Sequence, residues 1–173
     1  MTADEVRIRS SYLFLACSQA IGQFKARLIA ASATVPPSVT PLLERSLKRE
    51  LGLLFRYWAT RQIWERWEDR AQDAKALNLA LLRLFFDGLK LPKDGSGLRY
   101  AELSTLFDET VELSHRITNA LGVEHGPLLK ELQGAILPWR DAVVQYTTEA
   151  LELPLDQLSA KIQEWGEPSL HAS

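Results

Sequence analysis

The longest uninterrupted helical pattern in this sequence runs from Pro41 to Leu91, and it limits what the chain can fold into. After its first residue the stretch contains no proline, and Gly52 and Gly88 are its only weak helix breakers. Thr40 is a good N-cap residue, and Pro41 suits the first helical position. One unbroken α-helix of this length would extend for roughly 75 Å. We therefore predict an all-α, single-domain bundle organised around one long central helical stretch.

The apolar face of this stretch changes direction along its length. With about 100° between successive residues, one apolar stripe ends at Trp58 and another begins at Trp64, displaced by roughly 150°. No glycine or proline lies at residues 59–62, so we predict a continuous helix between two sets of neighbours, with a break near residue 60 as the alternative. A homodimer with C2 symmetry would supply the second set of neighbours. The first stripe comprises Leu43, Leu47, Leu51, Leu54 and Trp58, and the second comprises Trp64, Trp67, Ala71, Ala74, Leu81, Leu82, Phe85 and Leu89.

Three tryptophans of this stretch are interleaved with arginines, and we take Trp58, Trp64, Trp67 and Arg61 as candidate interface residues. Aromatic residues and arginine are enriched where proteins bind one another. Tryptophans on helical stripes are also typical of a core. Aromatic side chains interleaved with arginines also suit the stacking of nucleic-acid bases, or a pocket for a flat apolar ligand. We predict an assembly surface, with the core as the main alternative.

A basic ridge follows one side of the same stretch, and no acidic residue of the stretch shares that side. A helix laid along phosphates or against an acidic protein needs such a surface. A solvated helix face is the alternative interpretation. The candidate contacts for an anionic partner are Arg45, Lys48, Arg49 and Arg56.

The remaining helical patterns predict a bundle of about five or six helices in one domain, residues 1–166, followed by a C-terminal tail, residues 167–173. We expect helices from about residue 3 to 31, 100 to 121, 126 to 150 and 154 to 165. Pro138 lies within the third of these, where we predict a kink rather than an end. Residues 92–97 form the clearest loop.

Charge is distributed unevenly along the 173 residues, although the net charge is only −2. Residues 1–99 carry a formal charge of +6, and residues 100–173 carry −8. Opposite charges attract at short range, so we predict that the two parts pack against each other with complementary surfaces.

No catalytic, metal or cofactor site can be assembled from the sequence motifs. Glu112 and His115 have the spacing of a di-iron helix motif, but the second such pair is absent and both residues face away from the apolar stripe of their helix. The chain has three histidines and no nucleophile-elbow, phosphate-loop or dinucleotide-binding motif. We therefore predict that the protein is not an enzyme and has no cofactor.

The single cysteine, Cys17, lies on an apolar helix face, which predicts a buried, inert thiol and fits the reducing cytoplasm. The apolar run of six residues that ends at Cys17 is too short for a signal-peptide core. Nothing approaches the roughly 20 apolar residues of a membrane span, so we predict a cytoplasmic protein without a membrane partner.

Taken together, these patterns favour a non-enzymatic helical interaction protein, an adaptor or regulator of another macromolecule, which self-associates as a homodimer through the long helix. Two alternatives stay open: a nucleic-acid-binding accessory subunit that uses the basic ridge, and a binder of a hydrophobic small molecule that uses the tryptophans.

Overall fold

The computed structural model describes residues 1–31, 38, 40–89, 115 and 126–165. Within them the regular structure is helical, which confirms the predicted all-α class. The elements are α1 (Ala3–Ala31), α2 (Thr40–Arg66), a 3₁₀ turn η1 (Glu68–Arg70), α3 (Ala71–Leu89), α6 (Gly126–Glu152) and α7 (Leu155–Trp165). The expected helix at 100–121, apart from His115, the loop at 92–97 and the tail at 167–173 lie outside the described residues.

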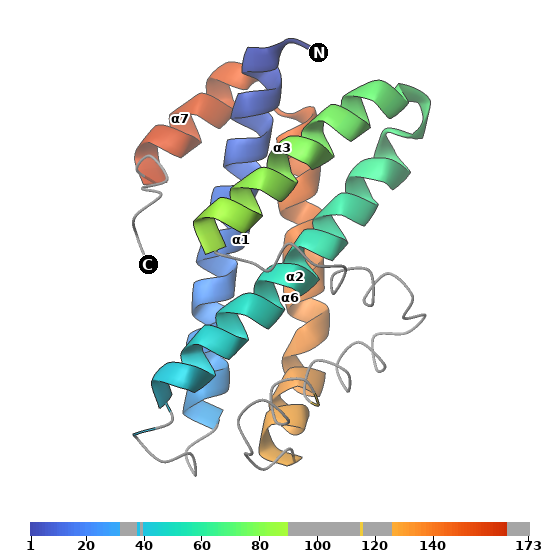
Figure 1. Ribbon diagram of the computed structural model, residues 1–173. Helices are drawn as coiled ribbons and strands as arrows, with labels where there is room; N and C mark the ends of the chain where they lie inside the picture. Colours follow the sequence, from blue (N-terminus) through green and yellow to red (C-terminus); the bar gives the residue numbers. More distant parts are fainter. Residues whose placement is uncertain (32–37, 39, 90–114, 116–125, 166–173) are drawn as a thin grey trace.

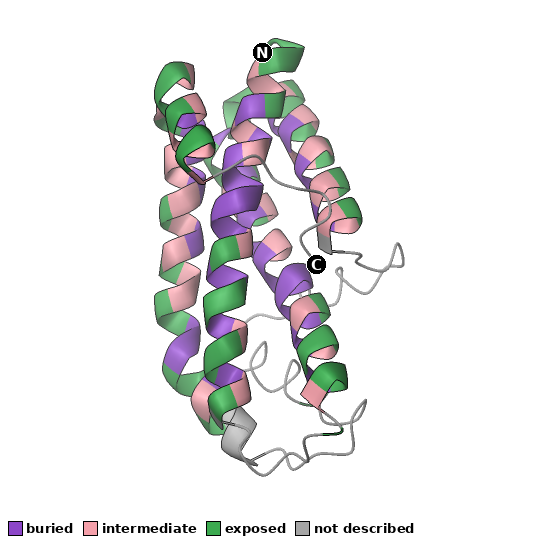
Figure 2. Ribbon diagram, turned by 90° about the vertical axis from the view of Figure 1, so that its left-hand side faces the viewer, coloured by how far each residue is buried: buried purple, intermediate pink, exposed green. Residues whose placement is uncertain are grey.

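Helix α1 is the centre of the described bundle, because it contacts α2, α3, α6 and α7. Helices α2 and α3 form an antiparallel hairpin that lies in front of α1 and α6, and α7 packs beside α1 (Figure 1). The buried residues follow the inward sides of the helices, whereas exposed residues follow their outer sides (Figure 2). The organising element is thus the first helix and not the 41–91 stretch.

The predicted continuous helix over 41–91 is wrong. Helix α2 ends at Arg66, Trp67 leaves the helical conformation with φ −115° and ψ 38°, and α3 begins at Ala71. The alternative placed a break near residue 60. The observed break lies later in the chain, at Trp67. Folding back allows both parts of the stretch to bury their apolar faces against the same α1 helix, so one subunit satisfies both faces.

Side-chain contacts stabilise the turn between α2 and α3. Arg70 stacks over the Trp67 indole, with its guanidinium carbon 4.2 Å from the ring centroid. It also donates to Asp73 at 3.0 and 2.8 Å. The backbone N–H of Arg70 donates to the Trp67 carbonyl at 2.9 Å. Glu68 and Asp69 precede α3, where the helix dipole favours negative charge.

The core of α2 extends beyond its predicted stripe. All five residues of the first stripe are buried, and the buried face continues at intervals of four through Ala59, Ile63 and Trp67. Every residue at 50–55 is buried, because the middle of α2 is surrounded by other parts of the chain. From the second stripe, Trp67 of the turn and Ala74, Leu81 and Phe85 of α3 are buried. Leu77, which was not part of the predicted stripe, is buried with them. Trp64 is exposed, so its assignment to that stripe is wrong.

Helix α1 begins and packs as predicted. The backbone N–H of Glu5 donates to the Thr2 hydroxyl at 3.1 Å, which is an N-cap contact. Cys17 is fully buried, as predicted, and this burial raises the pKa of its thiol. The apolar spacing predicts a buried stripe of seven residues, of which Val6 is only half-buried and the other six are buried: Leu13, Cys17, Ala20, Ile21, Phe24 and Leu28.

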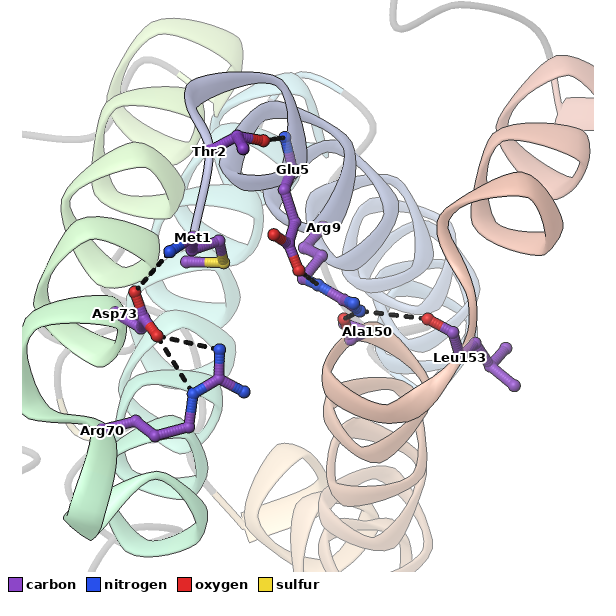
Figure 3. Close-up of polar contacts among 8 residues, drawn as sticks. All are labelled: Met1, Thr2, Glu5, Arg9, Arg70, Asp73, Ala150 and Leu153. Atoms are coloured by element: carbon purple, nitrogen blue, oxygen red, sulfur yellow. Dashed lines mark hydrogen bonds and ion pairs between the residues drawn. The ribbon is translucent and has the colours of Figure 1, made fainter.

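The basic first part and the acidic second part of the chain meet across α1, α2 and α6. Arg27 on α1 pairs with Glu131 on α6, and Arg66 at the end of α2 pairs with Glu152. Arg9 on α1 donates to backbone carbonyls at the end of α6 (Figure 3). The two ion pairs are those expected from the complementary charges of the two parts.

Helices α6 and α7 close the bundle. Helix α6 passes through Pro138, as predicted, and the proline side chain is exposed. The kink there stays a prediction. After Pro154, α7 brings Trp165 onto the Tyr12 ring of α1, with ring centroids 5.2 Å apart. Leu158 anchors α7 in the core.

Candidate interaction surface

The structure separates the three candidate tryptophans. Trp58 is 2% exposed and Trp67 is 7% exposed, so both belong to the core of the subunit. Trp58 packs with Phe55 at a centroid distance of 5.3 Å. Trp64, in contrast, is 42% exposed on the outer side of α2. Of the predicted interface residues, only Trp64 and Arg61 present much of their side chains to solvent.

The Trp64 surface, as we define it, consists of Tyr57, Arg61, Trp64, Glu65 and Glu68. The spacing of the first three residues places them on one side of α2. Glu65 follows Trp64 directly, and Glu68 lies in the turn after α2. Figure 1 shows that this end of α2 lies at a corner of the molecule, beside the turn into α3.

Two neighbours fix the orientation of Arg61 on this surface. Its Nε donates to Glu65 Oε1 at 2.7 Å, and its Nη1 donates to the Tyr57 hydroxyl at 3.3 Å. The hydrogen bonds with Glu65 and Tyr57 raise the pKa of Arg61, which remains a cation at any physiological pH. The third nitrogen, Nη2, makes no hydrogen bond with a described residue.

Unlike Arg61, Trp64 and Glu68 are not held by described neighbours through stacking or ion pairs. Trp64 has no aromatic stacking partner among the described residues, and Glu68 makes no ion pair with any of them. Glu68 is a member of the surface that the sequence reasoning missed. No helical spacing identifies it, because α2 ends at Arg66 and Glu68 lies in the turn that follows.

The basic ridge presents fewer free charges than its sequence suggests. Arg49 pairs with the buried Glu50 at 3.1 Å, and Lys48 is half-buried and engaged in contacts. The Nε of Arg45 donates to the Pro41 carbonyl at 3.4 Å, and this arginine is otherwise exposed.

Arg56, the last residue of the ridge, is a packing residue in this fold. Its guanidinium carbon lies 5.6 Å from the centroid of the Phe86 ring, where a cation–π contact joins α2 to α3. Burial lowers the pKa of Arg56, and its Nε has no hydrogen-bond partner among the residues that the structure describes. The two exposed cations of the ridge are therefore Arg45 and Arg49, and Arg49 is paired with Glu50.

A polar cluster between α1, α6 and α7 was not predicted. The Tyr12 hydroxyl donates to Glu149, and Lys161 Nζ lies 3.6 Å from the same carboxylate. Burial, followed by the hydrogen bond to Glu149, raises the pKa of Tyr12 above its usual range. These residues are distant in sequence, so only the assembled fold brings them together. They hold α7 against the bundle.

Comparison with protein-family models, curated proteins and solved structures returned no match to this chain. Within the described residues, no three His, Cys, Asp or Glu side chains are grouped closely enough to hold a metal ion. His115 is exposed, and its proposed partner Glu112 lies outside the described residues. No described helix has both the length and the apolar character needed to cross a membrane.

Proposed function

We propose that this chain is a non-enzymatic helical interaction protein, an adaptor or regulator of another macromolecule, and that the Trp64 surface is its contact site. The observation that supports the proposal most directly is the exposure of Trp64 beside an arginine held by two neighbours. Tryptophan, tyrosine and arginine are the residues most enriched among those that dominate binding energy. An orientation fixed before binding also lowers the entropy lost on association.

The original reason for a homodimer no longer holds. It required a continuous helix with two apolar faces, whereas α2 and α3 fold back and satisfy both faces within one subunit. The proposal now depends on the Trp64 surface alone.

The two alternative functions have less support. A nucleic-acid groove along α2 would have limited access to Arg56, whose side chain is half-buried and packs on Phe86. A ligand pocket lined by the tryptophans would require Trp58 and Trp67, which are buried in the core. A cytoplasmic location remains part of the proposal, supported by the single, buried cysteine.

Affinity capture with the full chain as bait tests the proposal. Trp64→Ala is compared with Leu137→Ala, which removes a similarly exposed apolar side chain from α6. We expect wild type and Leu137→Ala to retain the same macromolecule in stoichiometric amount, and Trp64→Ala to bind it at least roughly 10-fold more weakly. Equal retention by all three baits, or no retention by wild type of any macromolecule other than this chain, would show that the proposal is wrong.

A further inference from the structure

We infer that the outer face of α6 binds a second copy of this chain, with the two α6 helices antiparallel. In this contact Lys130 of each copy pairs with Asp141 of the other. Leu137 of each copy packs over Gly134 of the other. The inference goes beyond the proposed function, because it concerns a different helix and uses neither Trp64 nor the two-faced stretch that first suggested a dimer.

Four exposed residues make up this α6 face: Lys130, Gly134, Leu137 and Asp141. At about 100° per residue they lie within a sector of roughly 60° around the helix axis. All four lie inside the continuous helix Gly126–Glu152, so helical spacing applies to each of them. Leu137 is 54% exposed, the highest value among the large apolar residues that the structure describes. The face therefore presents an apolar side chain to solvent between two charges of opposite sign.

The order of these residues along α6 is self-complementary. In an antiparallel pair related by a two-fold axis, residues equally far before and after the axis face each other. An axis that passes between residues 135 and 136 places Leu137 of each copy opposite Gly134 of the other. Lys130 and Asp141 are also equally far from this point, each roughly 8 Å along the helix. One position of the axis therefore pairs the opposite charges and seats each leucine on a glycine.

Gly134 leaves room for the second copy. A Cβ added at this position would meet nothing within 4 Å. Glycine destabilises an exposed helix relative to alanine, and no described neighbour in the subunit requires the missing side chain here. Close approach of a second helix accounts for a glycine at this position, because the leucine of the other copy needs the space.

The two charges of the face are available for a contact between copies. Neither Lys130 nor Asp141 makes an ion pair or side-chain hydrogen bond with any residue in the described part of the chain. The residues three and four positions away from each of them on α6 are uncharged, so the helix itself offers no partner. In contrast, Glu131 on the flank of α6 already pairs with Arg27.

Another exposed apolar residue shows why this face is distinctive. Leu79 on α3 is 46% exposed, but Lys75 and Arg83 lie four residues before and after it. An isologous antiparallel contact through Leu79 would place these cations opposite one another, and like charges repel. The α6 face instead places a cation opposite an anion.

The contact is small, because one face of one helix covers less than the roughly 800 Å² per partner of a standard interface. We therefore expect a weak dimer, with a dissociation constant on the order of 10 to 100 µM. Association must be measured over a concentration range that brackets these values.

Sedimentation equilibrium of the full chain from about 1 to 500 µM provides the test. Wild type should approach twice its monomer mass of 19.5 kDa as concentration rises. Lys130→Glu and Asp141→Lys should each weaken association at least roughly 10-fold, because each places like charges opposite one another. The double variant should restore association, and so should an equimolar mixture of the two single variants, in which opposite charges meet again.

A substitution of Gly134 tests the packing separately from the charges. Gly134→Gln adds a neutral side chain where the leucine of the other copy would sit, and should weaken association at least roughly 10-fold. The subunit itself should remain folded, because glutamine favours a helix more than glycine does and the position is open. Lys75→Glu, which reverses an exposed charge on α3, is the matched control and should leave association unchanged. Circular dichroism of each variant checks that it is folded.

A wild-type monomer over the whole range would overturn the inference. So would folded Lys130→Glu, Asp141→Lys or Gly134→Gln chains that associate as well as wild type, or a folded double variant or mixture that fails to recover association.

The inference and the proposed function fail separately, because the two surfaces lie on different helices. Leu137→Ala should weaken self-association and still retain a macromolecule captured through the Trp64 surface. Trp64→Ala should lose that macromolecule and still self-associate as wild type does. A monomeric chain that captures another macromolecule through Trp64 refutes only the inference, whereas a dimer with the charge-reversal pattern that captures nothing else refutes only the proposed function.

Discussion

Arg9 is expected to stabilise this fold more than any exposed arginine, because it joins α1 to the end of α6. Its side chain is 11% exposed. Its Nη1 donates to the carbonyl of Ala150 at 2.8 Å and to that of Leu153 at 3.1 Å (Figure 3). The last carbonyls of a helix have no partner within the helix, and a cation there also complements the helix dipole.

The effect of Arg9→Ala follows from these contacts. One charge-assisted hydrogen bond contributes about 1.5–3 kcal/mol, and the second adds less because it shares the same nitrogen. Loss of the cation beside the helix end adds about 0.5 kcal/mol. We therefore expect Arg9→Ala to lower the free energy of unfolding by about 3 kcal/mol. With a urea m-value of about 2 kcal/mol/M, the unfolding midpoint should fall by about 1.5 M.

Arg7→Ala is the matched control on the same helix. Arg7 is 68% exposed and pairs with the equally exposed Asp4. Such surface pairs contribute little, so its removal should cost about 0.5 kcal/mol or less. Urea unfolding followed by circular dichroism compares the two variants. If Arg9→Ala loses no more stability than Arg7→Ala, the contacts with α6 do not stabilise the fold and the reasoning is wrong.

Three further predictions concern a glycine pair, the thiol of Cys17 and the half-buried carboxylate of Glu149. The new Cβ of Gly22→Ala would meet no atom within 4 Å, so this variant should raise the free energy of unfolding by about 1 kcal/mol. The new Cβ of Gly88→Ala would lie 2.5 Å from the buried Phe14 ring, so this variant should lower the free energy of unfolding by about 1 kcal/mol. Thermal unfolding compares the two variants. Cys17, buried with a raised pKa, should not react with a thiol reagent until urea unfolds the chain, and rapid labelling of the native protein would contradict this. Burial acts to raise the pKa of Glu149, but the hydrogen bond from Tyr12 and other contacts outweigh it and lower that pKa. The stability from Glu149 is therefore present above its unfolded pKa of about 4.3 and is lost as the pH falls through the folded value, so urea midpoints at pH 7 and 3 should differ less in Glu149→Gln than in wild type.

Local sequence signals predicted the parts of the fold that depend on local contacts. Thr2 and the apolar spacing of α1 gave the start and the buried face of that helix, because capping and periodicity act over a few residues. The same holds for the passage of α6 through Pro138. Contacts such as Arg9 with the end of α6 join residues far apart in the chain, and no spacing rule identifies them.

The break after Arg66 was missed because the residues there are compatible with a helix. What ends α2 is tertiary: Trp67 enters the core, Arg70 stacks over it, and α3 returns along α2. Propensity is a weak prior that such packing overrides. The acidic residues at 68–69 were the available local signal, since they favour the N-terminus of a new helix.

The position of the break also determines which tryptophan is exposed. Ile63 and Trp67 continue the buried face of α2 at an interval of four residues, so the core receives Trp67. Trp64 lies about 60° from Trp67 around the helix, on the side turned away from that face, and remains largely in solvent. A helix continuing past residue 67 would have grouped Trp64 with the apolar residues of the second part. The fold-back that removes the first argument for a dimer is therefore the same feature that leaves the Trp64 ring exposed at the end of α2.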